Sequence, residues 1–147
     1  MVPANNGPIT YWDYIQIEQL LSLQSGLEAD DLAISPDEMV FITVHQVYEL
    51  WFKIALRDLR AARDLFKQPR VPDDMLAGAC RLLDRLTIIF RLSAQHFPLI
   101  ETLTTRDYLE FRDKLFPANG GQSPQFRALE IVLGLQDEDR LPYARAQ

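Results

Sequence analysis

Apolar residues recur along most of this chain at the three- and four-residue spacing of helices, and no stretch alternates in the manner of a strand. The strongest helix start lies at Ser35, a favoured N-cap residue, with Pro36 suited to the first helical position and Glu38 placed to complete a capping box. No glycine or proline follows until Pro69, so we predict one helix of about thirty residues, or ~45 Å at 1.5 Å per residue. The pattern predicts an all-α fold, a helical bundle with two long helices.

A second long helix is predicted after a turn at residues 68–72. Asp73 and Asp74 suit a helix N-terminus, and the apolar pattern continues toward Thr102, with a kink expected at Pro98 because proline cannot donate the helical hydrogen bond. Shorter helices are predicted before and after the two long ones. Their expected limits are Thr10 with Asp13 to about Leu23, Thr104 with Asp107 onward, and Ser123 with Pro124 to Gly134.

Length and composition indicate one domain and argue against two classes of partner. The 147 residues, 48% of them hydrophobic, suffice for a single core. We expect a loose segment at residues 1–9 and one helical domain over residues 10–147. The net charge of −6, with basic residues scattered among acidic ones, argues against nucleic acid. Charges interrupt each apolar run before the ~20 residues of a membrane span, so no membrane is expected.

The chain has one cysteine, Cys80, which stands among apolar residues. We expect it to fill an apolar position, as free cysteines commonly do. A single cysteine cannot form an internal disulfide. The sequence therefore suits a cytoplasmic protein.

One histidine stands inside an apolar and aromatic helical run. Phe41 and His45 are four residues apart, so their rings share a helix face. A titratable ring in such surroundings is either a hydrogen-bonded core histidine or a residue that serves a ligand. Spacing by itself favours the core histidine, and both roles stay open here.

A second group of candidate ligand residues lies further along the chain. Tyr108 and Arg112 share a helix face, and a loop with two consecutive glycines, Gly120 and Gly121, follows them. A guanidinium fork beside exposed backbone amides suits a carboxylate. The alternative is a surface ion pair between the guanidinium and a neighbouring acid, namely Glu101, Asp107 or Asp113.

Taken together, these segments resemble the tryptophan 2,3-dioxygenase family, over about residues 10–135 and in the family's order and spacing. The resemblance rests on the runs Tyr11–Ile15, Leu20–Gln24, Asp37–Met39, His45–Gln46, Glu49–Lys53, Leu99–Thr104, Phe111–Asp113, Gln122–Arg127, Leu129–Glu130 and Leu133–Gly134. It implies an all-α haem-dioxygenase architecture and a haem b enzyme. That enzyme opens the indole ring of L-tryptophan with dioxygen to N-formylkynurenine, in the kynurenine pathway. It also implies a homotetramer.

The resemblance assigns roles to individual positions. The Phe41 ring would lie on the indole, and His45, on the distal side of the haem, would be the catalytic residue at the indole nitrogen. Tyr108 and Arg112 would hold the amino acid, the arginine pairing with its carboxylate. A neutral imidazole can accept an N–H, and a guanidinium matches a carboxylate bidentately. The further assignments are Ile42, Thr43 and Val44 for substrate, Tyr11, Tyr14 and Ile15 for a neighbouring subunit's site, and Phe97, Asn119 and Gly120 for the cofactor.

The chain departs from the family's pattern at several of these positions. Trp12 and Asp13 stand where members have Gly-Ser, and the run Asn119-Gly120-Gly121 stands where members have a small residue followed by Gly-Phe. Phe97 stands where members have tryptophan. The substrate is therefore expected to differ in detail.

The family's iron-ligating histidine falls beyond the region that resembles this chain. His45 matches the distal position and His96 matches no ligand. We therefore expect an N-terminal portion of such an enzyme, without the C-terminal haem-ligand region. We expect no metal ligand in this chain and no activity from the chain by itself.

Two other functions fit an all-α chain. A four-helix carboxylate metal protein needs inward Glu-x-x-His pairs, but Ile42 and Ser93 occupy the positions three before His45 and His96. We set that function aside. A non-catalytic helical oligomer that kept the scaffold and lost the chemistry stays open, because a helical core needs none of the ligand-binding side chains.

Overall fold

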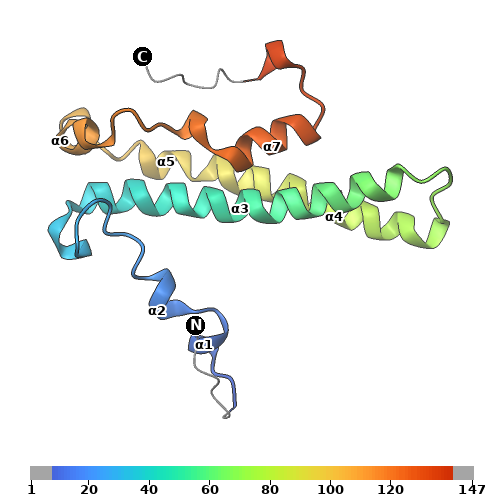
Figure 1. Ribbon diagram of the computed structural model, residues 1–147, viewed down its shortest axis with the longest axis horizontal. Coiled ribbons are helices and arrows are strands. Elements are labelled where there is room, and N and C mark those ends of the chain that lie inside the picture. The colour runs from blue at the N-terminus through green and yellow to red at the C-terminus, as the bar shows by residue number, and fades with distance from the viewer. Residues whose placement is uncertain (1–7, 141–147) are drawn as a thin grey trace.

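The computed structural model describes residues 8–140, and within this range the chain is all-α, with no strand, as the sequence predicts (Figure 1). Residues 1–7, most of the predicted loose segment, lie outside the described range, as do residues 141–147. The elements are α1 (Tyr11–Tyr14), α2 (Ile17–Leu20), η1 (Asp31–Ala33), α3 (Pro36–Phe66), α4 (Asp73–Gln95), α5 (Phe97–Ile100), α6 (Thr105–Leu115), η2 (Gly120–Gln122), α7 (Pro124–Val132) and η3 (Asp137–Asp139). None of the described helices is long and apolar enough to cross a membrane.

Helix α3 is the long helix predicted from the absence of glycine and proline, and it spans 31 residues. The Ser35 hydroxyl accepts from the backbone N–H of Glu38 at 3.1 Å, and Pro36 occupies the first helical position. The other half of the predicted capping box is wrong. The Glu38 side chain does not return to Ser35 but is buried, and it approaches the amino group of Lys114 on α6.

Residues 8–24, which include α1 and α2, form an arm that leads away from the helical body (Figure 1). Thr10 caps α1 as predicted, accepting from Asp13 N–H at 3.1 Å. The single helix expected to continue to about Leu23 is wrong, because Gln16 adopts a left-handed conformation with φ of 53° and α2 ends at Leu20. Helices shorter than ~12–15 residues are marginal without packing. Neither α1 nor α2 has a buried residue, so no packing stabilises a longer helix in the arm.

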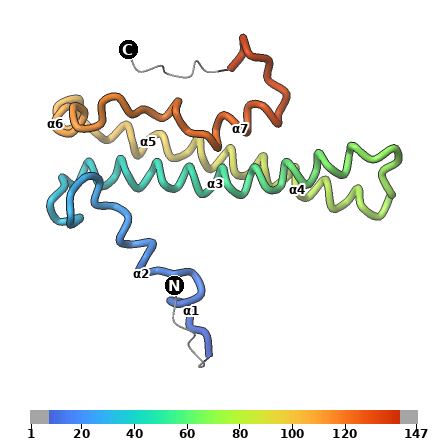
Figure 2. Tube along the Cα trace, viewed as in Figure 1, coloured from blue at the N-terminus to red at the C-terminus, as the bar shows by residue number. Residues whose placement is uncertain are grey.

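Helix α4 runs back antiparallel to α3 after the turn at residues 67–72 (Figure 2). The predicted kink at Pro98 is instead a break at His96, where α4 ends and the short α5 begins. A proline ring clashes with the carbonyl four residues earlier, so the regular helix ends before it. Pro98 then lies in the first turn of α5.

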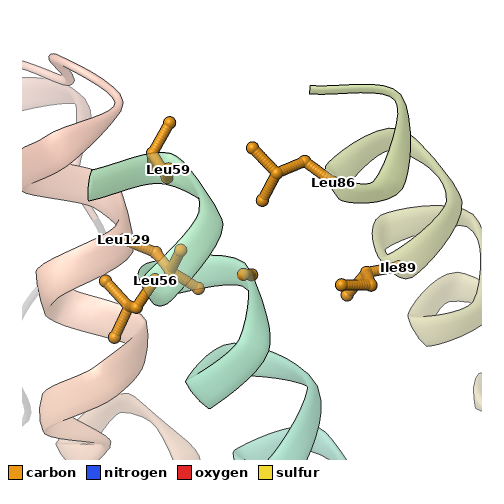
Figure 3. Packing of buried hydrophobic residues seen from close by; sticks show 6 residues of the cluster. Leu56, Leu59, Leu86, Ile89 and Leu129 are labelled. Carbon is orange, nitrogen blue, oxygen red and sulfur yellow. The ribbon is translucent and has the colours of Figure 1, made fainter. Parts of the chain in front are cut away.

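The core lies where α3, α4 and α7 meet (Figure 3). Leu56 and Leu59 of α3 pack with Leu86 and Ile89 of α4 and with Leu129 of α7. Burying a side chain of this size contributes about 1.5–3 kcal/mol, so this cluster is what fastens α7 to the two long helices. The apolar position expected for Cys80 is wrong: its side chain is exposed, and its neighbour Ala79 is buried instead.

The two shorter helices begin where their caps predict. Thr104 accepts from Asp107 N–H at 3.2 Å at the start of α6, and Ser123 accepts from Phe126 N–H at 3.1 Å at the start of α7. Gly134, with φ of 87°, follows the end of α7, in a conformation that suits glycine. Helix α7 lies alongside α3, and α6 crosses near the N-terminal end of α3, so both bring residues of the second half of the chain to it (Figure 1).

Candidate functional site

A cleft of about 880 Å³ lies beside α3. Its walls come from the arm, α3, α4, α5, the loop before α7 and α7 itself, and most of the lining side chains are apolar. Sites for small molecules and cofactors have volumes of about 300–1,000 Å³ and largely apolar walls with a few polar groups. The cleft has the size and character of such a site. Its apolar lining includes Leu20, Leu23, Leu50, Phe52, Phe90 and Phe126.

Five residues singled out from the sequence line this cleft together, namely His45, Phe97, Asn119, Gly120 and Gly121. The Asn119 side chain caps η2 by accepting from Gly121 N–H at 3.0 Å, which holds the glycine loop in place. A Cβ added to Gly120 would meet no protein atom within 4 Å. The space beside this glycine is therefore open to a ligand that occupies the cleft.

A second group of predicted residues gathers where α6 crosses α3. The Phe41 ring lies 4.1 Å from the His45 ring and 6.0 Å from the Tyr108 ring, measured between centroids. Phe111, to which sequence reasoning gave no role, lies 5.4 Å from Phe41 and 5.5 Å from Tyr108. These separations are typical of interacting aromatic pairs. His45 belongs to this aromatic group and also lines the cleft, so the two groups meet at its ring.

Arg112 follows Tyr108 by one turn of α6 and is half-buried. No carboxylate among residues 8–140 forms an ion pair with its guanidinium, so the pairing with Glu101, Asp107 or Asp113 considered from the sequence is not found. Asp107 instead accepts from the Thr104 hydroxyl at 2.5 Å. The guanidinium therefore keeps its donors for another acceptor.

The His45 ring has a defined orientation. Nδ1 lies 2.7 Å from the backbone carbonyl oxygen of Phe41. A carbonyl oxygen only accepts, so Nδ1 carries the proton and donates. In the neutral ring, Nε2 then has no proton and can accept a hydrogen bond. The geometry makes His45 an acceptor for an N–H group at the cleft.

The three residues between Phe41 and His45 do not share one environment. Val44 is buried, Thr43 is exposed, and the Ile42 side chain faces the loop at Gly26. Consecutive helical residues point in different directions, so these side chains cannot all face one ligand. The substrate-binding role assigned to Ile42, Thr43 and Val44 stays a prediction.

The arm residues predicted to serve a neighbouring subunit are exposed. Tyr11 and Tyr14 are 74% and 77% exposed, and Ile15 is 39% exposed. The base of the arm is fastened to α3, because Gln46 donates to the Leu23 carbonyl at 2.7 Å and accepts from Gln24 at 2.6 Å. The arm tip therefore projects away from its own cleft, and its role in a neighbour's site stays a prediction.

Sequence reasoning assigned no role to Glu49 and Gln125, which the structure joins. The Gln125 side-chain amide donates to the Glu49 carbonyl at 2.9 Å and to the Glu49 carboxylate at 2.7 Å. Glu49 follows His45 by one turn and is the one Asp, Glu, Lys or Arg among the described residues that line the cleft. The two residues are 76 positions apart, so no local pattern in the sequence could have paired them.

Tyr48 also lines the cleft and was not singled out. Its hydroxyl donates to the Ser93 carbonyl at 3.1 Å, and burial raises the pKa of its phenol above the ordinary value of 10.0. The His96 ring meets the Tyr48 ring edge-on at 5.7 Å. In the described part of the chain, Ser93 Oγ and His96 Nδ1 are buried without a hydrogen-bond partner. His96, at the end of α4, thus packs against α3.

Comparison with known proteins identifies the family. The family model described as tryptophan 2,3-dioxygenase matches residues 2–147. This chain belongs to the tryptophan 2,3-dioxygenase family. The resemblance predicted from the sequence is confirmed.

Proteins named tryptophan 2,3-dioxygenase are similar to this chain over nearly its whole length. One from Sorangium cellulosum is 53% identical over 93% of the chain, and tryptophan 2,3-dioxygenase 2 from Ralstonia nicotianae is 51% identical over 91%. One from Rattus norvegicus is 41% identical over 97%. The matched region is 33%, 36% and 35% of these relatives, so the chain spans about a third of their length.

The cofactor that tryptophan 2,3-dioxygenases imply fits the cleft in part. A haem is a flat, mainly apolar ring with carboxylates at one edge, and the cleft offers apolar walls, the open space at Gly120 and polar groups at Asn119. Among residues 8–140 no group of three or more His, Cys, Asp or Glu side chains could hold a metal ion. The residues present therefore suit the ring of a haem, and they supply no metal-binding cluster.

Proposed function

We propose that this chain forms the substrate side of a tryptophan 2,3-dioxygenase, a haem b enzyme that opens the indole ring of L-tryptophan with dioxygen to give N-formylkynurenine. The observation that supports this function best is the meeting of two groups at His45. The His45 ring lines an apolar, cofactor-sized cleft and also contacts the aromatic group of Phe41 and Tyr108. Tyr108 stands on the same helix as Arg112, and together these side chains suit an aromatic amino acid.

His45 would orient the indole. Its Nδ1 proton is committed to the Phe41 carbonyl, so Nε2 is the atom that accepts the indole N–H. The Phe41 ring, 4.1 Å from the imidazole, would lie against the indole ring. The two side chains together would fix the direction in which the indole enters the cleft.

Tyr108 and Arg112 would hold the amino-acid group. Arg112 forms no ion pair with the described residues and presents a planar fork that matches a carboxylate through two parallel hydrogen bonds. Tyr108 stands beside the indole-binding Phe41 ring. The carboxylate would thus be held at a set distance from the indole, which orients the 2,3-bond toward the cleft.

Phe97, Asn119 and Gly120 would hold the haem ring, and the apolar walls would exclude water. When bound, the haem supplies the reactivity toward dioxygen, and the protein supplies orientation and a dry site. The iron ligand would come from a part of the enzyme outside this chain. Tyr11, Tyr14 and Ile15 of one subunit would complete the site of another in a homotetramer, and the exposure of both tyrosines supports this. We place the enzyme in the cytoplasm.

A non-catalytic scaffold is the competing function. The core cluster contains none of the proposed substrate residues, so packing does not require them. Arg112 is half-buried and forms no ion pair within residues 8–140, which a scaffold would not require, so it favours the enzyme.

The test uses a complete-length protein, made by joining this chain to the part of the Sorangium cellulosum relative that it does not match. We call it the joined protein. After loading with haem, it should consume L-tryptophan under air and form N-formylkynurenine. Arg112→Leu should abolish most of this activity, whereas Arg106→Leu, an exposed arginine on the same helix, should not. A folded, haem-loaded joined protein that leaves tryptophan unchanged would support the scaffold.

A further inference from the structure

The helix that carries Tyr108 and Arg112 has few attachments to the rest of the molecule. Phe111 is the one buried residue of α6, with 1% of its surface exposed. An isolated helix of 11 residues is marginal in water. The rings of Phe111 and Tyr108 both meet the one Phe41 side chain, and this single point of contact does not by itself fix the rotation of α6. A second attachment is needed to fix the direction in which Arg112 points.

Lys114 supplies that attachment. Its amino group lies 3.3 Å from the Glu28 carboxylate and 3.8 Å from the Glu38 carboxylate. Glu28 belongs to the loop after the arm, and Glu38 belongs to the first turn of α3. Lys114 therefore joins α6 to two segments that are distant in sequence, the further one 86 positions away.

The two carboxylates are not equivalent. The Glu28 side chain is 40% exposed, whereas the Glu38 side chain is 6% exposed. Exposed ion pairs contribute little, but a buried carboxylate that loses its partner is strongly destabilising. Lys114 is the one cation within 4.0 Å of Glu38 in the described part of the chain. The contact with Glu38 is thus the one that holds α6.

Glu38 is itself held in place. A Cβ added to Gly26 would lie 3.2 Å from Glu38 Oε1 and 3.3 Å from the Ile42 side chain, so the loop is pressed onto the carboxylate. The φ of Gly26 is +61°, a conformation that other residues rarely adopt. Glu38 is buried and has this loop packed beside it, so its carboxylate is a well-defined anchor for Lys114.

Phe111 and Lys114 are three residues apart on α6, and they face α3 and the loop. Tyr108 and Arg112 are four residues apart on the adjoining face. The two attachments together fix the rotation of α6 about its own axis.

We propose that Lys114 is a positioning residue for substrate binding: its ion pair with Glu38 sets the rotation of α6 and thereby aims the Arg112 guanidinium at the substrate carboxylate. The substrate part of this inference rests on the proposed function.

The kinetic test uses the joined protein with Lys114→Met, which keeps the length and removes the charge. KM for L-tryptophan should rise about tenfold, with kcat changed less than threefold, and KM for tryptamine, which has no carboxylate, should stay within twofold. In Lys114→Arg, which keeps the positive charge, KM for tryptophan should stay close to the value of the unmodified joined protein. Glu38→Gln should reproduce the effect, and Glu28→Gln and the exposed control Lys67→Met should not. Equal changes for tryptophan and tryptamine, or no change, would overturn the proposal.

A second measurement does not depend on activity. In the 147-residue chain, amide hydrogen exchange over residues 105–115 should be faster in Lys114→Met than in the unmodified chain, while exchange over residues 51–59 stays the same. Unchanged exchange in α6 would refute the positioning role even if the joined protein is active. Faster exchange in α6 together with an inactive joined protein would instead count against the proposed enzyme function and leave the attachment of α6 supported.

Discussion

The imidazole of His45 donates through Nδ1 to the backbone carbonyl oxygen of Phe41, one turn earlier on α3, at 2.7 Å. This bond assigns the proton to Nδ1 and leaves Nε2 as the acceptor in the neutral ring. The Phe41 ring lies 4.1 Å from the imidazole, in the aromatic group that it forms with Tyr108 and Phe111. The pair therefore forms one unit, a hydrogen-bond acceptor beside an aromatic wall.

If His45 accepts the indole N–H, His45→Ala should lower kcat/KM for L-tryptophan by about tenfold in the joined protein. One hydrogen bond between neutral groups contributes about 1–1.5 kcal/mol, and a water can replace part of it. The effect should be much smaller with 1-methyl-L-tryptophan, which has no indole N–H. Steady-state kinetics with both substrates measure this difference. Equal losses for the two substrates would remove the hydrogen bond to the indole from the mechanism.

Arg112→Leu should cost more than His45→Ala. Loss of one partner from a charge-assisted pair in a water-poor site costs about 2–5 kcal/mol, so kcat/KM for L-tryptophan should fall by at least thirtyfold, about 2 kcal/mol at 1.36 kcal/mol per tenfold. The comparison is with tryptamine, whose kcat/KM should change little. Arg106→Leu on the same helix is the control. If the preference for tryptophan over tryptamine survives in Arg112→Leu, the guanidinium does not bind the carboxylate.

The bond between Gln125 and Glu49 should affect haem binding. Gln125 lies in the first turn of α7, just after the loop that carries Asn119 and Gly120, and its amide fastens this end of the loop to α3. Gln125→Glu places two carboxylates together and should weaken haem affinity of the joined protein by about tenfold, on the scale of ~1–3 kcal/mol for an unsatisfied buried group.

The reciprocal double variant, Glu49→Gln with Gln125→Glu, restores a side-chain donor opposite a carboxylate but not the bond to the backbone carbonyl at Glu49, so it should recover part of the haem affinity lost in Gln125→Glu. Gln68→Glu, at an exposed position in the turn after α3, is the control. Absorbance titration with haem measures the affinity. A double variant as weak as Gln125→Glu would show that this pair does not hold the loop.

Tyr48→Phe should change how stability depends on pH. Burial raises the pKa of the Tyr48 phenol above 10.0, so the fold favours the neutral form. This contribution is fully present below pH 10.0, the unfolded value, and is lost as pH rises through the folded pKa. Urea unfolding of the chain should therefore show a steeper loss of stability above that pH in the unmodified chain than in Tyr48→Phe. Parallel curves above that pH would contradict the assignment.

At neutral pH, the free energy of unfolding of Tyr48→Phe should be lower by about 0.5–1.5 kcal/mol, because the variant lacks the hydrogen bond to the Ser93 carbonyl.

The 147-residue chain mixed with haem should not give the spectrum of a five-coordinate, histidine-ligated iron, and it should not consume tryptophan. His96 packs edge-on against Tyr48 and does not line the cleft, while His45 stands on the substrate side. Optical spectra of the reduced and oxidised complexes measure the ligation. Stoichiometric histidine-ligated haem that disappears in His96→Ala would contradict this prediction.

Local sequence patterns predicted the helices and their starts. The caps Ser35, Thr104 and Ser123 act within three residues of themselves, and the helical face shared by Tyr108 and Arg112 follows from spacing. The end of the helix predicted in the arm and the end of α4 were predicted less well. A short helix without packing does not persist, and the proline in α5 ends α4 earlier than a kink would require.

The sequence by itself determined the helical class, the caps and the residues that resemble the family, because these depend on neighbours along the chain. Only the tertiary structure decided the partners that lie far apart in sequence. It placed Phe41 beside Tyr108, Gln125 on Glu49 and Lys114 on Glu38. These contacts arise because the core of α3, α4 and α7 and the buried Phe111 bring the second half of the chain back along α3. No local pattern encodes the distance between side chains that packing brings together.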